Sequence, residues 1–451
     1  MRHTIHDRFA SVSWVLPALI SLFVGACGYT RFVGVLPEEE ARVFTGSGSL
    51  TLFGSDIDVD GNYYLVGNVE GVVELGSIEL RGDTAQTAFV ASFTREGEPR
   101  WGQTWSGSFA RATAVDVRGE SVGVTGYVRG PISGPFPLTT GSRQELFVFS
   151  FDRQSGAPLS SPLAFASAAG NVQGKGIVSS GSFTGLCGHY IGAVDFGLGS
   201  LAVSPLDADH GFVVVFDSVG EPVWSESVVG ANTLLGGGFL RADGSAIASG
   251  VYRDGIIGGR NAVGQDAIVI SFSSDGTTEY ELGFGSAGGD QVDAVAAFED
   301  GVVVVGTSEG ELSIAGETLD ARGGRDAFIV RLDETGGVVW ARLLDGTGDE
   351  SLRRIRVDEG RIYVAGDFDD ELRFGDHVFR SNGGRDVMVL VFDADGNESD
   401  AAQLGGTGNE SVGGFEVQGS RAWLAVSLDG ETVLDSSGPQ LGLFGLRTLQ
   451  F

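Results

Sequence analysis

The chain has 451 residues, of which 73 are glycine and only 11 are proline, and its formal net charge at pH 7 is −31. The scarcity of proline excludes collagen. A hydrophobic fraction of 42% is enough to build a core, which excludes a disordered chain. Because phosphate backbones repel a chain this acidic, we expect no nucleic-acid partner.

The first 26 residues have the layout of a secretory signal peptide. Arginines precede an apolar stretch from Phe9 to Ala26, which ends in small residues directly before Cys27. A basic start, an apolar middle and small residues at the cleavage site define such a signal. A transmembrane anchor is the alternative, but the central Pro17 and several serines make the stretch marginal for spanning a bilayer.

The cysteine that follows the small residues resembles the signal of bacterial lipoproteins. This resemblance implies that Cys27 is lipidated and becomes the new N-terminus. Gly28 follows it in place of aspartate, and in the sorting rule of some Gram-negative bacteria this implies the outer membrane. We therefore expect a signal peptide over residues 1–26, a linker over residues 27–40, and attachment to the membrane through the lipid anchor only.

A short motif recurs through the rest of the chain: an apolar strand, a turn glycine, then an aromatic residue or leucine. Ala327-Phe328-Ile329 with Gly336 and Trp340 is one copy. The central residues of the copies are Phe89, Phe147, Phe212, Ile268, Phe328, Met388 and Phe444. In the first five copies the aromatic residue or leucine follows this central residue by the same interval, and the sixth has Asp400 there.

A second motif alternates with the first. Two short strands enclose a polar turn and end at glycine, as in Ile57–Gly67 and Ile355–Gly366. Asp-Gly pairs favour hairpin turns. Four antiparallel strands per unit of 50–60 residues, repeated seven times, predict an all-β fold, a seven-bladed β-propeller. A β-solenoid is the main competitor, although its coils are shorter and parallel.

The two ends of the repeat region predict how the ring closes. Ala41–Gly48 resembles Ala341–Gly348, which forms the last strand of the fifth unit and the linker after it. The final unit lacks such a strand. We therefore expect residues 41–451 to form the propeller, with residues 41–45 pairing with residues 443–449 to complete the last blade.

These units resemble the SBBP-type β-propeller repeats of bacterial secreted proteins and lipoproteins. Asp326-Ala327-Phe328-Ile329-Val330 through Trp340, followed by Gly346-Thr347-Gly348-Asp349, is the copy most similar to that pattern. The resemblance covers about residues 41–451 and is weakest in the second and third copies. It implies a propeller fold and a location in the cell envelope, and it implies no activity.

Two short motifs match catalytic or cofactor-binding patterns, but the elements predicted around them do not suit those functions. Gly283–Gly288 fits a dinucleotide fingerprint, but a strand follows it where a helix is required. Gly306–Gly310 fits a nucleophile elbow but lies between two strands. The repeat region holds three histidines at different spacings, so we expect no catalytic, cofactor or metal site. Cys187 fits a small buried residue, with a reactive thiol as the alternative.

Acidic residues leave two possibilities open. Asp58–Asn62 and Asp393–Asn397 look superficially like calcium loops but lack the further ligands of such loops, so calcium remains an alternative. The linkers between units carry polar groups that a propeller places on one face. They are either solvated turn residues or a binding face for a cation or a basic partner: Asn171, Asn232, Asp290, Asp349, Glu350, Asn409 and Glu410.

These observations favour a monomeric, lipid-anchored module of the cell envelope that binds or scaffolds a protein or glycan partner without catalysis. An envelope enzyme, a carbohydrate-active hydrolase using acids of the linker face, is the alternative. Two carboxylates about 5–10 Å apart in a concave pocket would favour the enzyme. A purely structural surface protein, without any deep pocket, is a third possibility.

Overall fold

The computed structural model describes residues 41–451 except 230–231, 430, 434–438 and 442–443. The expected signal peptide, the linker and Cys27 lie outside the described residues. Within the described part every regular element is a β-strand, as the sequence predicts. It contains no helix of the length and apolar character that a bilayer crossing requires.

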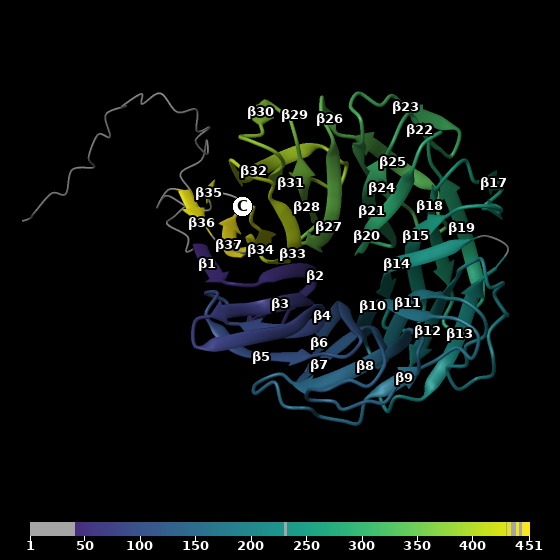
Figure 1. The fold of residues 1–451 in the computed structure, drawn as a ribbon. Helices are drawn as coiled ribbons and strands as arrows, with labels where there is room; N and C mark the ends of the chain where they lie inside the picture. Colours follow the sequence, from purple (N-terminus) through teal and green to yellow (C-terminus); the bar gives the residue numbers. More distant parts are fainter. Residues whose placement is uncertain (1–40, 230–231, 430, 434–438, 442–443) are drawn as a thin grey trace, which may run out of the picture. The chain divides into compact units, whose positions relative to one another are not determined.

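Antiparallel sheets follow one another along the chain (Figure 1). Among the described residues, four sheets have four strands each: β6 (Phe109–Arg118), β7 (Ser121–Arg129), β8 (Glu145–Asp152), β9 (Leu163–Phe165); β10 (Val172–Ser180), β11 (Phe183–Tyr190), β12 (His210–Phe216), β13 (Pro222–Val228); β14 (Thr233–Leu240), β15 (Ala246–Tyr252), β18 (Asp266–Phe272), β19 (Thr278–Phe284); and β20 (Asp290–Phe298), β21 (Gly301–Ser308), β24 (Asp326–Leu332), β25 (Val338–Leu343).

Two larger sheets complete the set. One consists of β27 (Glu350–Asp358), β28 (Arg361–Phe368), β31 (Asp386–Phe392), β32 (Glu398–Gly406), β35 (Glu431–Val433) and β36 (Pro439–Leu441). The other joins the two ends of the described chain through β33 (Ser411–Gln418), β34 (Arg421–Ser427), β37 (Phe444–Gln450), β1 (Ala41–Gly46), β3 (Tyr63–Leu75), β4 (Ile78–Phe93) and β5 (Pro99–Trp105), with β2 (Ser49–Ile57) paired to β3.

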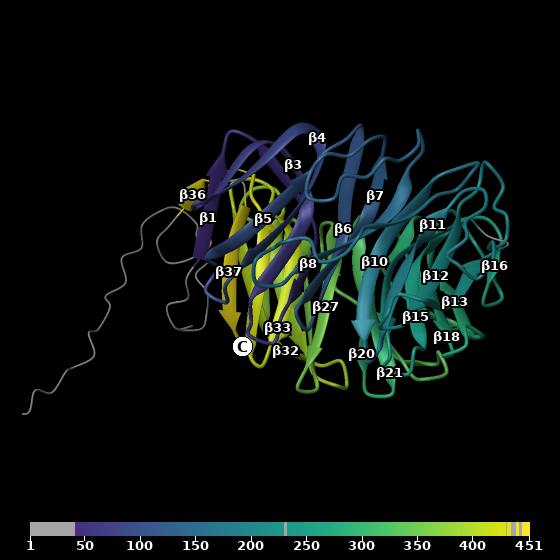
Figure 2. The same ribbon diagram turned by 90° about the horizontal axis from the view of Figure 1, so that it is seen from below.

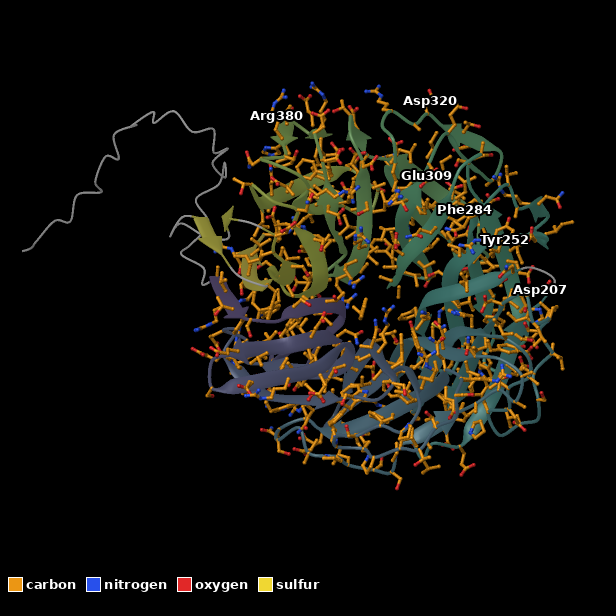
Figure 3. The ribbon with its side chains drawn as sticks, in the orientation of Figure 1. Asp207, Tyr252, Phe284, Glu309, Asp320 and Arg380 are labelled. Atoms are coloured by element: carbon orange, nitrogen blue, oxygen red, sulfur yellow. The ribbon has the colours of Figure 1, made fainter. Side chains whose placement is uncertain are left out.

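Several short accessory strands lie outside the main sheets. They are β16 (Ile256–Ile257), β17 (Arg260–Asn261), β22 (Leu312–Ile314), β23 (Glu317–Leu319), β26 (Asp345–Gly346), β29 (Glu371–Phe374) and β30 (His377–Arg380). Figure 3 shows Asp320, just after β23, and Arg380, at the end of β30, on the outer rim. The sequence did not predict the hairpins β16–β17, β22–β23 and β29–β30, which are inserted between the second and third strands of a unit, or β26, which lies in the linker before β27 and pairs with β29.

The first strand of each sheet contacts the first strand of the next. β2 contacts β6, and the series continues through β10, β14, β20, β27 and β33, which in turn contacts β2. Figure 1 shows these strands around a central space, with the other strands of each sheet farther out, the arrangement found in β-propellers, and Figure 2 shows the same sheets from the side.

Residues from the start and the end of the described chain pair in one sheet. β1 runs antiparallel to β37, with Ala41 opposite Arg447 and Phe44 opposite Phe444. Arg42 donates from Nε to the Glu96 carbonyl at 3.0 Å, and Arg342 of β25 donates in the same way to the Gly396 carbonyl at 3.2 Å. The resemblance between the segments starting at Ala41 and Ala341 thus extends to equivalent contacts with the following turn.

The middle strands of the sheets are buried on both faces. Every residue of β12, β15, β18, β21 and β31 is buried. A strand covered on both faces has no polar side, so its sequence is a mostly apolar run rather than an alternation. Val302–Val305 in β21 is the plainest example.

Turn glycines pack on aromatic residues of the preceding sheet. Gly156 has φ +69°, and a Cβ atom there would lie 2.5 Å from the Trp101 ring. Gly396 stands in the same relation to Trp340. Trp101 Nε1 also donates to the Arg153 carbonyl at 3.0 Å. The spacing of glycine and aromatic residue seen in the sequence therefore joins neighbouring sheets.

One junction lacks this contact. Leu159 takes the place of the aromatic residue in the second copy and is 50% exposed, and β9 is only three residues long. A Cβ atom at Gly220, the turn glycine of the next sheet, would have nothing within 4 Å. A cavity of about 500 Å³, lined in part by Leu163, Phe216 and Gly220, opens at this junction.

Candidate functional site

Each first strand carries a β-bulge at an equivalent place. The register of β10 against β11 shifts between Gly174 and Gly176, so that Lys175 is the extra residue. The same shift recurs in β2, β6, β14, β20, β27 and β33, where the extra residues are Phe53, Thr113, Gly236, Asp293, Arg353 and Gly413. A bulge changes the direction of one side chain without ending the strand, and bulges are common beside functional sites.

These bulged residues surround a central cavity. A cavity of about 460 Å³ is lined by Phe53, Thr113, Lys175, Gly236, Asp293 and Arg353, among other residues of the first strands. Its volume lies in the range of small-molecule sites, about 300–1,000 Å³. Six of the seven bulged residues line this space, and they range from Gly236 to Lys175, Asp293 and Arg353, which is how a repeated fold can build one asymmetric site.

The cationic side chains of the cavity differ in how they are paired. Arg353 donates to Asp367 at 2.7 Å. Arg354 donates from Nη2 to the carbonyls of Phe53 and Gly413 at 2.8 and 2.9 Å, which joins the first strands β27, β2 and β33. Lys175, the single lysine of the chain, has no hydrogen bond or ion pair with any described residue, and its Nζ lies 4.7 Å from the Tyr127 ring centroid.

Arg356 and Glu416 form a bidentate pair beside the cavity. Arg356 donates to the two carboxylate oxygens of Glu416 at 2.6 and 2.5 Å. Ser55 Oγ donates to Glu416 Oε1 at 2.7 Å and accepts from the Phe415 N–H at 3.0 Å. The planar guanidinium of Arg356 and the carboxylate of Glu416, joined by two hydrogen bonds, hold a fixed geometry. This cluster therefore links neighbouring sheets, and its charges are already paired.

Three carboxyls that line the cavity have raised pKa values. Burial raises the pKa of Asp56 well above its usual value, and the negative charges of Glu416 and Asp116 add to the effect. Burial also raises the pKa of Asp116 and brings that of Asp293 to about 6. Asp56 accepts from the Val117 N–H at 2.5 Å and Asp116 from the Ser179 N–H at 2.8 Å, so both also bridge adjacent sheets.

Four of the linker residues that the sequence suggested as a binding face are half-buried or exposed, and they hydrogen-bond to the preceding sheet. Asn171, Asn232, Asp349 and Asn409 each accept, through a side-chain oxygen, the backbone N–H of Gln144, Asp209, Arg325 or Arg385, at 3.0–3.2 Å. In each case the donor immediately precedes a third strand of the preceding sheet. The hydrogen bonds of these side chains connect each sheet to the next, and none of the four lines the central cavity.

The remaining linker acids are buried, contrary to the expectation of solvated groups. Asp290, Glu350 and Glu410 are each 0% exposed. Ser286 and Ser308 donate to Asp290, and the Gly406 N–H donates to Glu410 at 3.1 Å. Neither oxygen of Glu350 has a hydrogen-bond partner. Burial first, then the charges of Asp326 and Asp369, raise the Glu350 pKa to about 9.

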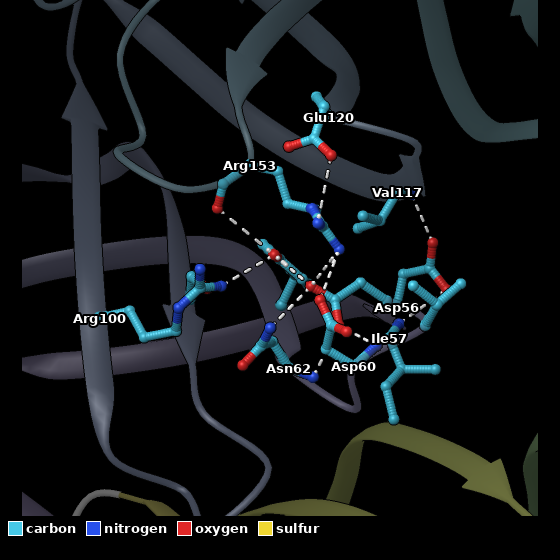
Figure 4. Close-up of polar contacts among 12 residues, drawn as sticks. Asp56, Ile57, Asp60, Asn62, Arg100, Val117, Glu120 and Arg153 are labelled. Carbon is cyan, nitrogen blue, oxygen red and sulfur yellow. Dashed lines mark hydrogen bonds and ion pairs between the residues drawn. The ribbon is translucent and has the colours of Figure 1, made fainter.

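In the two turns that look like calcium loops, the first aspartate accepts hydrogen bonds from the turn itself. The Asp58 carboxylate accepts from the N–H groups of Asp60 and Asn62, from the Asn62 amide and from Tyr64. Arg153 adds an ion pair at 3.1 Å (Figure 4). Asp393 makes the same turn with Asp395 and Asn397. Both aspartates therefore have turn-forming roles.

The described residues hold neither a metal-binding cluster nor a thiol suited to nucleophilic attack. These contain no group of three or more histidine, cysteine, aspartate or glutamate side chains arranged to hold a metal ion. Cys187 is buried, as expected, and burial raises its thiol pKa to about 12, which does not suit a reactive nucleophile.

No sequence expectation included the bulged residues. A bulge arises from hydrogen-bond register across two strands, which a single strand does not reveal. One signal was available: the residue after the bulge is small in every repeat except at Arg354, namely Gly54, Ala114, Gly176, Gly237, Ala294 and Gly414.

Comparison with known proteins yields distant similarities. No family model matches the chain. It is 25% identical over 258 residues to "Regulatory protein FlaEY" of Caulobacter vibrioides, a match over 49% of this chain and 26% of that protein. The chain thus spans about a quarter of the length of this curated relative.

Two solved structures are similar at low sequence identity. The Pan2 WD40 domain of Neurospora crassa has a TM-score of 0.46 and 12% identity, with 90% of this chain and 91% of that chain covered. The β-propeller domain of the Trilobed protease from Pyrococcus furiosus has a TM-score of 0.47 and 9% identity, with 89% and 95% covered. The description of the fold rests on the strand pairing.

Proposed function

We propose that the chain is a lipid-anchored binding module of the cell envelope, whose central cavity receives part of a protein or glycan partner. The observation that carries this proposal is the ring of bulged residues, because it places chemically different side chains from successive repeats around one cavity. The module is monomeric, binds no nucleic acid and is held at the outer membrane through lipidated Cys27.

The proposed architecture is a seven-bladed propeller of the SBBP repeat type, closed by β1 in the last blade. Support comes from the cyclic contacts of the first strands, from the pairing of β1 with β37, and from the equivalent roles of Arg42 and Arg342. With β1 in this place, the edge of β37 is paired rather than open to association.

The anchor is tested by lipid labelling. In cells fed an alkyne-bearing fatty acid, the full chain is expected to incorporate the label, and Cys27→Ser is expected to abolish it. Cys187→Ser is the matched control, because Cys187 is buried and should leave labelling unchanged. Labelling that persists in Cys27→Ser would disprove the anchor.

Binding is tested by capture from envelope extracts with the detergent-solubilised full chain, with and without added calcium. The Lys175→Glu variant, which reverses a charge in the cavity, is expected to lose the captured partner. Arg81→Glu makes the same reversal at a side chain that is 67% exposed on β4 and should retain it. A partner captured equally by both variants would place binding outside the cavity.

A carbohydrate-active hydrolase is the second candidate. Asp116 and Asp293 favour it, since both line the cavity with raised pKa values, and a general acid requires a raised carboxyl pKa. Release of reducing sugar from envelope polysaccharide, lost in Asp293→Asn, would support the hydrolase. An absence of turnover by the unmodified chain would exclude it.

A further inference from the structure

Lys175 differs from the other cations of the cavity in having no partner. The charges of Arg353 and Arg356 are matched by Asp367 and Glu416, and Arg354 is held by backbone carbonyls. Lys175 contacts the Tyr127 ring and has no hydrogen bond or ion pair with a described residue. Its ammonium group has been partly removed from water without a compensating anion, which is costly.

A second cation lies close by and strengthens the local positive potential. Arg111 stacks on the Phe53 ring, with its Cζ 4.8 Å from the ring centroid, and its buried Nε has no hydrogen-bond partner. Burial first, then the charge of Arg111, lower the Lys175 pKa to about 8, while Asp209 acts in the opposite direction. Two cations therefore lie close together, and neither forms an ion pair with a described residue.

His189 and Asp209 are the other ionisable groups near Lys175. Burial first, then the charge of Lys175, lower the His189 pKa to about 3, so this side chain is neutral. Asp209 Oδ1 lies 3.9 Å from His189 Nε2 and does not reach Lys175 with a hydrogen bond. Neither group neutralises the lysine.

The neighbouring strand leaves room beside Lys175. Gly236 is the bulged residue of β14, the next first strand, and a Cβ atom there would have nothing within 4 Å. Gly174 and Gly176 flank the lysine on its own strand. Lys175, Phe53 and Gly236 therefore line the central cavity together, with Arg111 packed on the Phe53 ring and Tyr127 packed on Lys175.

We propose that this region binds an anionic group, a carboxylate or a phosphate, through the Lys175 ammonium with Arg111 beside it. The inference deepens the proposed binding role and names the chemistry of the ligand. In a chain of net charge −31, a pair of cations without a carboxylate partner is also a place where an anion meets local attraction rather than repulsion.

The single lysine makes a direct experiment possible. Full chain labelled with ¹³C at the lysine ε carbon, in detergent, gives one lysine side-chain resonance. Titrations with inorganic phosphate and with glucuronate are compared with sodium chloride at matched ionic strength. Binding is expected to produce a saturable shift and to raise the Lys175 pKa by about one unit or more, since an opposite charge within hydrogen-bonding reach does so.

The two anions distinguish the source of the charge. A response to phosphate alone assigns a phosphoryl ligand, a response to glucuronate alone assigns a carboxylate sugar, and a response to both supports the shared anionic chemistry. A resonance that changes no more with either anion than with chloride overturns the proposal.

Variants separate binding from folding. Gly236→Leu fills the open space and keeps the lysine resonance, so it should fold and lose the anion response. In thermal melts, phosphate or glucuronate should stabilise the unmodified chain and Lys175→Arg but not Lys175→Met. Arg81→Met, which removes an exposed cation, should respond like the unmodified chain. An anion response retained in Lys175→Met would place the site elsewhere.

Failure here is distinguishable from failure of the binding role. A captured envelope partner together with a silent lysine resonance would leave the module in place and refute the anion site alone. An anion response without any captured partner would support the site and count against a macromolecular partner.

Discussion

Acids at the start of the third strand and the following first strand form buried pairs. Asp266 lies with Asp290, and Asp326 with Glu350. Burial raises the pKa of Asp290 and of Glu350, and the charge of the paired acid adds to it. In the first pair Arg260 Nε donates to Asp266 at 2.5 Å, and serines donate to Asp290. Glu350 has neither kind of donor. The Glu350 carboxyl is therefore a buried acid that lowers the stability of the fold, not a solvated surface acid.

The Glu350 carboxyl predicts a pH dependence with a definite sign. Its pKa is about 9 in the folded chain, against an ordinary value near 4.3, so the folded state holds a proton that the unfolded state has released. Stability from this group is therefore full at low pH and is lost as pH rises through that interval.

Glu350→Gln should remove this loss. At about pH 8.5 the variant is expected to be more stable than the unmodified chain by about 2 kcal/mol or more, because glutamine folds without taking up the proton that the Glu350 carboxyl must bind, at about 1.4 kcal/mol for each pH unit above the unfolded pKa. At about pH 5 the two should differ by no more than about 1 kcal/mol, because this pH lies within one unit of the unfolded pKa and little of that cost remains. Urea denaturation at both pH values measures the difference.

Glu317→Gln, at an exposed residue of β23, is the control and should have no effect at either pH. A Glu350→Gln variant less stable than the unmodified chain at the higher pH would contradict the assignment.

Junctions between sheets depend on the turn glycine and the aromatic residue that it meets. Gly156 and Gly220 occupy equivalent turns with φ of +69° and +86°. Only Gly156 has an aromatic ring in the way of a Cβ atom. The pair therefore separates backbone strain from packing.

Gly220→Ala should cost about 1–2 kcal/mol, because alanine is strained at positive φ. Gly156→Ala carries the same strain and also overpacks Trp101, which adds about 1–3 kcal/mol. Denaturant midpoints of the two variants measure the difference. Equal losses of stability would show that the Trp101 contact contributes nothing.

The same element shows what the sequence could predict. The equal spacing from Phe89 to Trp101 and from Phe328 to Trp340 predicted the strand and its partner, because the glycine–aromatic contact recurs. It is made at Trp101, Trp224, Tyr280 and Trp340. Leu159 was visible as a departure, and a shortened β9 with a cavity lies there. The bulge at Lys175 and the burial of Glu350 were not predictable, since both depend on which strand lies alongside.

At the scale of the whole molecule, the pairing of β1 with β37 joins residues from the two ends of the described chain. The similarity of Ala41–Gly48 to Ala341–Gly348 was sufficient to predict this pairing, and Arg42 repeats the contact of Arg342. Phe44 is buried and stacks on Phe444, with ring centroids 4.7 Å apart.

Deletion of residues 41–46 should destabilise the whole module. Loss of the buried Phe44 alone costs about 3–5 kcal/mol in typical cores, and the backbone pairs are lost with it. Phe44→Ala is the milder variant and should lower the melting temperature by a smaller amount. An unchanged melting temperature after the deletion would disprove a closing role for β1.

The same pairing sets an order of events during synthesis. Arg447 is made 406 residues after its partner Ala41, and at about 5–20 residues per second that delay is roughly 20–80 s. Throughout this interval β1 lacks its final neighbour while the intervening sheets have already emerged. Premature association with another chain is thus a hazard of translation itself, and a chaperone that covers the first strand until the last is made would protect the yield.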